Sequence, residues 1–243
     1  MKRGLAILAA VLVVSLGPAP AADATPFQDI QTSAHRESIL ELVERGITRG
    51  CAELAFCPGN PVTRAQMASF LVRALELPAA SAIGMQPRMF ADVAVGSTHA
   101  AAIGSLLAEG VTHGCAPDRF CPDAPVTRAQ MATFLVRARN LPVDGSSDFS
   151  DVPSGSVHAA AIGALATSGV TRGCSAGLFC PDAAVNREQM ASFLLRLLDL
   201  PPDPSSGRWQ LYYSTSPDGS DARPLRGAVV RGTVYVFLAP AGG

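Results

Sequence analysis

Apolar residues recur along most of the chain in a pattern that predicts a short helix, a loop and a longer helix, three times over. In each short helix the apolar positions are spaced by three and four residues, which places them on one helical face. They are Ile39, Leu42 and Val43, then Ile103, Leu106 and Leu107, then Ile162, Leu165 and Ala166. The longer helices carry a similar stripe, formed by Met67, Phe70, Leu71 and Ala74, by Met131, Phe134, Leu135 and Ala138, and by Met190, Phe193, Leu194 and Leu197. Three helix–loop–helix units are therefore expected.

The ends of these helices carry start and stop signals. Each longer helix is preceded by Val, begins at Thr or Asn, and has Gln three residues later, which is the signature of a capping box behind a hydrophobic staple. The cap residues are Thr63, Thr127 and Asn186, and the glutamines are Gln66, Gln130 and Gln189. Each shorter helix ends at a glycine suited to positive φ, which is Gly46, Gly110 or Gly169. Ser33, Ser97 and Ser156 are its expected N-caps, which would place His35, His99 and His158 in its first turn, in a structural role.

The repeats divide the chain into domains. They occupy residues 27–78, 90–142 and 149–201, and each opens with Phe-x-Asp-(Val/Ile) and closes with Leu-Pro. A unit of about fifty residues lies near the lower limit for independent folding, so we expect the three to share a core. Residues 208–243 read as a short β-rich tail, either a small sheet docked on the repeats or the opening of an incomplete domain. The expected fold class is mainly α with this β-rich tail.

The N-terminus predicts export. Lys2 and Arg3 precede an apolar run and then small residues, so residues 1–24 read as a signal peptide with cleavage near 21–24. The rest of the chain contains no lysine, and its arginines nearly balance its acidic residues. This composition argues against nucleic acid as a partner and against membrane association after signal removal. We expect a secreted protein.

Six cysteines form three C-x5-C pairs, and export makes disulfides the default interpretation. The pairs are Cys51 with Cys57, Cys115 with Cys121, and Cys174 with Cys180. A bridge across so short a loop stabilises a fold by about 2 kcal/mol through chain entropy. The rival interpretation is a metal site, for which each repeat offers a histidine on the preceding helix, but the spacing is not the usual C-x2-C. We expect three disulfides within the repeats and no metal.

One recurring residue is not explained by helix formation. Arg64, Arg128 and Arg187 fall at the first helical position, where the helix dipole disfavours a cation by about 0.3–1 kcal/mol. Three such arginines suggest either an internal carboxylate partner or an external anion, and a planar guanidinium suits a carboxylate. We expect these arginines to serve ligand binding more than folding. Asp29, Asp92 and Asp151 could each cap a turn, pair with an arginine or touch a ligand.

The order Phe-x-Asp-Val, His, Ile, Gly-(Val/Ile)-Thr-x-Gly, Phe-x-Pro, Thr-Arg-Ala-Gln resembles the S-layer homology family, over residues 27–201. The resemblance implies repeats packed in a pseudo-threefold arrangement, with grooves that bind cell-wall-linked polysaccharide, which in known members often carries an acidic pyruvate ketal. It places the Asp and Arg motifs in or near those grooves. Our candidate ligand-binding residues are Asp29, Arg64, Gln66, Asp92, Arg128, Gln130, Asp151, Arg187 and Gln189.

Some positions depart from the family pattern. Arg36, Ala100 and Ala159 stand where the family has Trp, Gln replaces its Glu, and the cysteines are additional. The sequence shows no Ser-His-Asp arrangement, phosphate loop or HExxH motif, so we expect neither an enzyme nor a cofactor. The expected function is attachment to the cell surface through wall polysaccharide. The alternatives are the anchoring fragment of a surface enzyme and a protein-binding assembly module.

Overall fold

The computed structural model describes residues 26–78, 90–143 and 148–200 and the backbone of three strands beyond them. The predicted signal peptide and its cleavage site lie outside the described residues. The described part contains six α-helices, two in each repeat. They are α1 (Arg36–Glu44), α2 (Arg64–Leu75), α3 (Ala100–Ala108), α4 (Arg128–Arg139), α5 (Ala159–Thr167) and α6 (Arg187–Leu198). The expected mainly helical repeats are confirmed.

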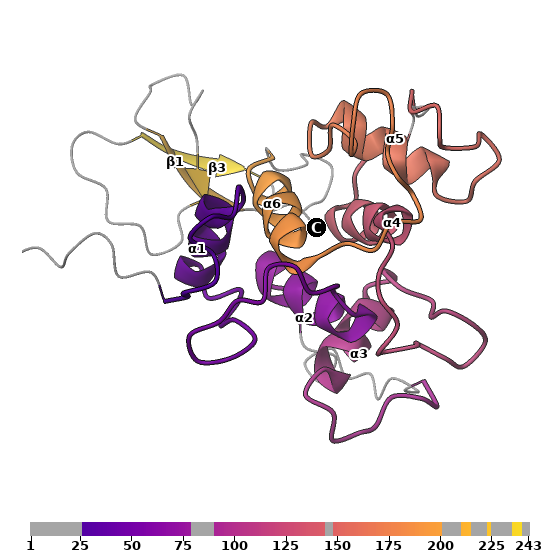
Figure 1. Ribbon diagram of the computed structural model, residues 1–243, viewed down its shortest axis with the longest axis horizontal. Coiled ribbons are helices and arrows are strands. Elements are labelled where there is room, and N and C mark those ends of the chain that lie inside the picture. Colours follow the sequence, from indigo (N-terminus) through magenta and orange to yellow (C-terminus); the bar gives the residue numbers. More distant parts are fainter. Residues whose placement is uncertain are drawn as a thin grey trace, which may run out of the picture.

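The three repeats close into a ring. The longer helices α2, α4 and α6 lie at the centre, and the shorter helices lie outside them (Figure 1). Each shorter helix packs on the longer helix of the preceding repeat, so α3 contacts α2 and α5 contacts α4. The first repeat completes the circle, because α1 contacts α6 of the third repeat. The pseudo-threefold arrangement is therefore confirmed.

Three valines form a closed circle of backbone hydrogen bonds at the centre. Val62 N–H donates to the carbonyl of Val185, Val185 N–H to that of Val126, and Val126 N–H to that of Val62, each at 2.9 Å. All three side chains are fully buried. Each valine directly precedes the cap of a longer helix, so the helix starts and the ring closure are set by the same short segments.

The starts of the longer helices are satisfied by their own caps and by the next repeat. Thr63, Thr127 and Asn186 each complete the predicted capping box with a glutamine. The next two amides donate outward: in α2, Arg64 N–H bonds to Ala124 O at 3.0 Å and Ala65 N–H to Pro122 O at 2.9 Å. Equivalent bonds join α4 to the third repeat and α6 to the first. These amides are therefore not available to an external anion.

The shorter helices begin two residues later than the serine caps predict. Each starts directly after its histidine, and the histidine itself occupies the cap position without a side-chain cap hydrogen bond. The serine hydroxyl instead accepts the N–H of the histidine two residues on, as in His35 N–H to Ser33 Oγ at 3.0 Å. Serine thus caps the turn before the helix, a short-range bond that competes with helix initiation. The glycine stops are as predicted, with φ of +70° at Gly110.

Three short strands follow the repeats, as the predicted β-rich tail requires. They are β1 (Gln210–Ser214), β2 (Arg223–Pro224) and β3 (Tyr235–Ala239). Both β2 and β3 pair antiparallel with β1, which gives the order β2-β1-β3, with Tyr212 opposite Phe237.

Two glycines of the second repeat provide a matched test of how tightly the cysteine loop is packed. A methyl group on Gly114 (φ +95°) would overlap the carbonyl oxygen of Arg119 and meet the Phe90 ring at 2.8 Å. Gly110 (φ +70°) has no atom within 4 Å of the same position. Gly110→Ala should cost about 1–2 kcal/mol for the left-handed backbone alone, whereas Gly114→Ala should cost about 1–3 kcal/mol more for overpacking. Denaturant unfolding measures both, and equal losses would contradict this packing.

Candidate functional site

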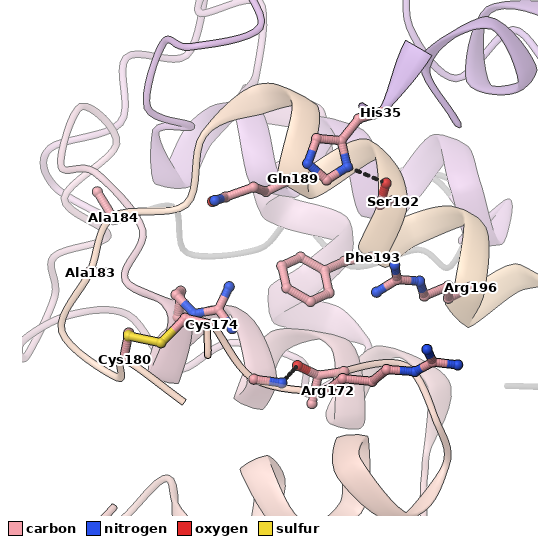
Figure 2. Close-up of a pocket in the computed structure, with 13 residues that line it drawn as sticks. His35, Arg172, Cys174, Cys180, Ala183, Ala184, Gln189, Ser192, Phe193 and Arg196 are labelled. Carbon is pink, nitrogen blue, oxygen red and sulfur yellow. Dashed lines mark hydrogen bonds between the residues drawn. A yellow bond between two sulfur atoms is a disulfide. The ribbon is translucent and has the colours of Figure 1, made fainter. Parts of the chain in front are cut away.

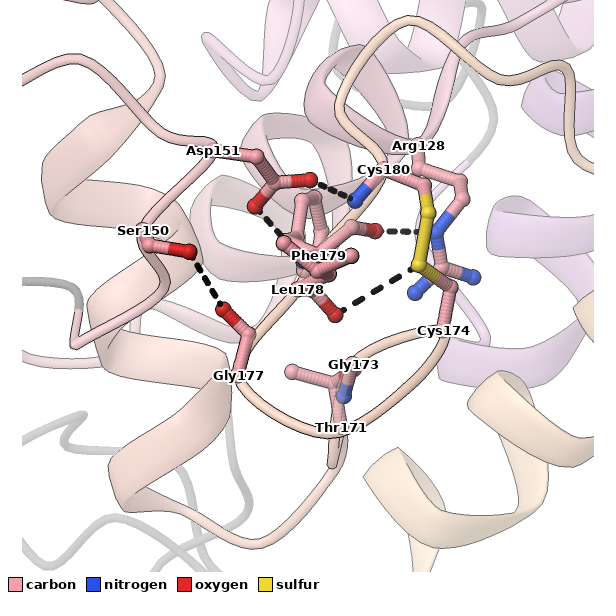
Figure 3. The surroundings of a disulfide bond; sticks show 10 residues. All are labelled: Arg128, Ser150, Asp151, Thr171, Gly173, Cys174, Gly177, Leu178, Phe179 and Cys180. Carbon is pink, nitrogen blue, oxygen red and sulfur yellow. Dashed lines mark hydrogen bonds between the residues drawn. A yellow bond between two sulfur atoms is a disulfide. The ribbon is translucent and has the colours of Figure 1, made fainter.

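The loop between the two helices of each repeat is held by a disulfide and by a carboxylate. The structure contains the predicted bridges Cys51–Cys57, Cys115–Cys121 and Cys174–Cys180. In the third repeat the Asp151 carboxylate accepts the N–H of Phe179 at 2.8 Å and of Cys180 at 2.7 Å (Figure 3). Asp29 and Asp92 make the same pair of bonds in their repeats. Of the three roles considered for these aspartates, the structure shows turn capping in every repeat and, for Asp92, also an ion pair with Arg119 at 3.6 Å.

The hydrogen bonds also fix the charge of these carboxylates. The N–H of Phe179 lowers the pKa of Asp151 below its ordinary value, against a smaller opposing effect of burial and with help from Cys180 N–H. Burial raises the pKa of Asp92, but the N–H groups of Phe120 and Cys121 outweigh it, so this pKa is also lowered. Both groups are therefore ionised at neutral pH.

In all three repeats, this loop presents a phenylalanine carbonyl to the arginine of the preceding repeat. Arg128 Nε donates to Phe179 O at 2.7 Å (Figure 3). Its guanidinium lies between two rings of the third repeat, 4.8 Å from the centroid of Phe179 and 5.3 Å from that of Phe193. Arg64 meets Phe120 and Phe134 in the same way, and Arg187 meets Phe56 and Phe70. We call each arginine with its carbonyl and two rings an arginine joint.

These joints give the arginines a folding role through a partner that sequence reasoning did not identify. Their internal partner is a carbonyl oxygen and two ring faces, rather than the carboxylate considered above. Each arginine is about 95% buried, and burial lowers its pKa, with a partly compensating effect of the nearest aspartate. A guanidinium nevertheless keeps its proton. Each joint therefore places a buried positive charge at the contact between two repeats.

One nitrogen of each joint arginine has no hydrogen-bond partner among the described residues. This nitrogen is the buried Nη2 atom of Arg64, Arg128 or Arg187. A buried donor without a partner costs about 1–3 kcal/mol, and more when it is charged. A bound anion would remove this cost.

Arg128 lines a pocket of about 360 Å³. Most of its wall comes from the third repeat, including the Cys174–Cys180 disulfide, Gln189 and Phe193 (Figure 2). Arg128 comes from the second repeat and His35 from the first. All three repeats thus contribute to one site.

The pocket carries a strongly positive lining. Arg172 and Arg196 of the third repeat join Arg128 there, and both side chains are exposed. The Asp151 carboxylate acts on Arg128 from outside this lining. Glu188, next to the lining residue Gln189, accepts a hydrogen bond of 2.6 Å from Ser33 Oγ. Three guanidinium groups around one pocket suit a carboxylate-bearing ligand.

The structure separates the candidate site residues into two groups. Arg128 and Gln189 meet at the pocket although they belong to different repeats, whereas Asp151 holds the loop and is not among the lining residues. Sequence reasoning missed Arg172, Arg196 and His35 as pocket residues. Arginine also stands at positions 49 and 73 of the first repeat, and this recurrence was the available signal. Ligand binding by the full candidate set stays a prediction.

The recurring histidines join the repeats. His35 Nδ1 lies 2.7 Å from Ser192 Oγ, His99 Nδ1 lies 2.7 Å from Ser69 Oγ, and His158 Nδ1 lies 2.8 Å from Thr133 Oγ1. Each pair links a shorter helix to the longer helix of the preceding repeat, which is the structural role expected. Within the described ranges, no cluster of three or more His, Cys, Asp or Glu side chains could hold a metal ion. No helix in those ranges is long and apolar enough to cross a membrane.

Comparison with known proteins supports this repeat organisation. The family model of the S-layer homology domain matches residues 26–68, 90–132 and 148–191. The Surface-layer 125 kDa protein of Lysinibacillus sphaericus is 26% identical over 205 residues, which cover 82% of this chain and 17% of that protein. A cell surface protein of Thermoanaerobacter kivui is 32% identical over 115 residues, 45% of this chain and 15% of that protein.

Enzymes are also among the relatives. Exoglucanase XynX of Acetivibrio thermocellus is 26% identical over 180 residues, which cover 71% of this chain and 16% of the enzyme. The chain spans less than a fifth of the length of the curated relatives it matches.

Removal of one joint arginine should destabilise the ring. Arg128→Gln loses the charged hydrogen bond to Phe179 O and both ring contacts, so we expect a loss of about 2–4 kcal/mol in unfolding free energy. Arg172→Gln is the matched control, because this side chain is exposed and its guanidinium makes no hydrogen bond to any described residue. It should change stability by less than about 0.5 kcal/mol. Thermal and denaturant unfolding measure both variants. An unchanged midpoint for Arg128→Gln would contradict the joint.

The lowered pKa of Asp92 predicts a defined acid dependence. The ionised carboxylate stabilises the fold, so its contribution is present above the ordinary Asp value of about 3.9 and is lost as the pH falls through the lower folded-state pKa. Asp92→Asn keeps one acceptor oxygen and replaces the other by an amide donor, so it loses one of the two N–H bonds and should be less stable at pH 7. The difference in unfolding free energy between the two proteins should shrink as the pH falls below about 4. A difference that stays constant from pH 7 to pH 2 would contradict this assignment.

Proposed function

The chain belongs to the S-layer homology domain family, and on that premise we propose that it is a non-catalytic attachment module that binds cell-wall polysaccharide in the pockets between its repeats. Membership of this family places it at the cell surface. The polysaccharide, its acidic character and the pocket as its binding site are our proposal.

The observation that carries the proposal is the unpartnered Nη2 atom of the Arg128 guanidinium. It is buried, positively charged and located on a residue that lines the pocket. A carboxylate that enters the pocket and reaches this nitrogen would supply the missing acceptor in a charge-assisted bond, which is about twice as strong as a neutral one. The same unpartnered nitrogen recurs on Arg64 and Arg187, which supports three equivalent sites around the ring.

Two departures from the family pattern fit recognition by charge. Gln189 stands where the family has Glu, so the pocket keeps the full positive charge of its three arginines. The family tryptophan is replaced by Arg36, Ala100 and Ala159, which removes a surface on which sugar rings could stack. A ligand held mainly by carboxylates is therefore favoured over a neutral sugar chain.

A second function is favoured by the relatives alone. An exoglucanase matches this chain over only 16% of its own length, which supports the chain as the anchoring part of a surface enzyme. That reading uses the same wall-binding pockets and differs only in what they anchor. An assembly module that binds protein remains the third candidate, and the experiment below separates it from the other two.

Sedimentation with purified, protein-free cell walls tests the proposal. We expect the chain to bind these walls, and Arg172→Gln to weaken binding by about tenfold, equal to about 1.4 kcal/mol, with little change in melting temperature. Arg119→Gln is the control, because Arg119 is exposed and is not among the residues that line this pocket. Its ion pair with Asp92, at 3.6 Å on the surface, contributes little.

Chemical reduction of the wall carboxyl groups provides the complementary test on the ligand. We expect it to abolish binding, and added salt to weaken binding to untreated walls, because charged contacts are screened. Binding that survives carboxyl reduction would contradict an acidic ligand. The absence of binding to any wall preparation would instead favour the protein-binding alternative.

A further inference from the structure

Each contact between repeats also contains a histidine whose two ring nitrogens have different surroundings. We call His35, His99 and His158 the joint histidines. Nδ1 pairs with a serine or threonine hydroxyl of the preceding repeat, at 2.7 Å in the case of His35 and Ser192. Among the described residues, Nε2 of His35 has no hydrogen-bond partner. Figure 2 shows the second ring nitrogen pointing away from Ser192, in a ring that belongs to the pocket lining. One nitrogen thus serves the fold and the other remains available.

The hydroxyl partners fix where the ring proton lies. Thr133 Oγ1 donates its proton to Ala129 O at 3.4 Å, and Ser192 Oγ donates to Ser38 Oγ at 3.0 Å. A hydroxyl has a single proton, so each of these oxygens must accept from the imidazole Nδ1–H. In His35 and His158 the neutral ring therefore carries no proton on Nε2, which takes one up when the ring becomes charged.

Charged groups surround these rings. Around His35 they are Arg128, Arg172 and Arg196 of the pocket, with Glu188 tied to the neighbouring Ser33. The charge of Arg73 lowers the pKa of His99 and that of Asp123 raises it. The charge of Arg137 lowers the pKa of His158. Burial first, and then these arginines, lower the pKa of His99 and His158 below the ordinary value. A bound carboxylate would reverse the sign of the local field.

We propose that an acidic polysaccharide entering these pockets is bound together with a proton, which the joint histidines His35, His99 and His158 take up on Nε2, so that attachment to the wall strengthens as the pH falls. This inference rests on the proposed function. The step is a simple protonation: solvent supplies the proton, the imidazole becomes an imidazolium, and its new N–H faces the ligand carboxylate. The ligand stays ionised throughout, because sugar carboxylates titrate well below pH 5 in the range of ordinary carboxyl groups.

Isothermal titration calorimetry of the full chain tests the proposal. The probe is the soluble polysaccharide that muramidase releases from purified cell walls, with its carboxyl-reduced form as control. We expect about tenfold tighter binding at pH 5.5 than at pH 7.5, since uptake of one proton changes affinity by at most tenfold per pH unit. Heats measured in phosphate and in Bis-Tris at pH 6.5 should differ, because the two buffers release the proton with different enthalpies.

The replacement of all three joint histidines by Asn tests whether these rings are the source of the proton effect. An asparagine amide can still donate from the position of Nδ1 but does not titrate, so the ratio of affinities between pH 5.5 and 7.5 should fall to about one. If the variant does not fold, the histidine Cε1–H resonances of the native chain give the same answer, since saturating polysaccharide should raise the pKa of the joint histidines. Equal affinity at both pH values, with equal heats in both buffers, would overturn the proton coupling and leave the proposed function intact. The absence of binding at every pH would overturn both.

Discussion

The closed circle of hydrogen bonds between Val62, Val126 and Val185 is the constraint on which the rest of the structure depends. It joins the three repeats at one point, directly before the caps of the three longer helices. Each cap then fixes the first turn of its helix, and the joint arginine is the first residue of that turn. Because the circle has no end, the third repeat meets the first through the same contacts that join repeats adjacent in sequence. No repeat of about fifty residues has to bury its apolar faces alone.

The contacts that hold the ring also leave the buried positive charge on which the proposed binding depends. Each joint arginine donates through Nε to a carbonyl of the neighbouring repeat, and its Nη2 has no hydrogen-bond partner among the described residues. The disulfide-bonded loop supplies the carbonyl for the first bond, and the aspartate holds that loop in place. A residue that serves both the fold and the pocket cannot be changed without an effect on stability. Exposed residues such as Arg172 are therefore the better probes of binding alone.

Local features of the sequence predicted most of the fold. The capping boxes depend on residues three positions apart and the disulfides on residues six apart, so both could be recognised directly. The joints could not, because Arg64 and Phe120 are 56 residues apart and Arg187 and Phe56 are 131 apart. The sequence marked the arginines as unexplained by helix formation, but it did not show that a carbonyl and two rings would receive them. The helix starts were placed too early because serine can cap either a helix or the turn before it.

Native-state hydrogen exchange at the amides of Val62, Val126 and Val185 tests the closed ring most directly. These three N–H groups form the circle, and the bond from Val62 to Val185 is the one that closes it. If the ring is a single cooperative unit, all three amides should exchange only through global unfolding, with the same free energy as denaturant unfolding gives. Exchange of the Val62 amide at a free energy well below that of the Val126 and Val185 amides would show that the first and third repeats separate while the others stay folded, and it would contradict the account.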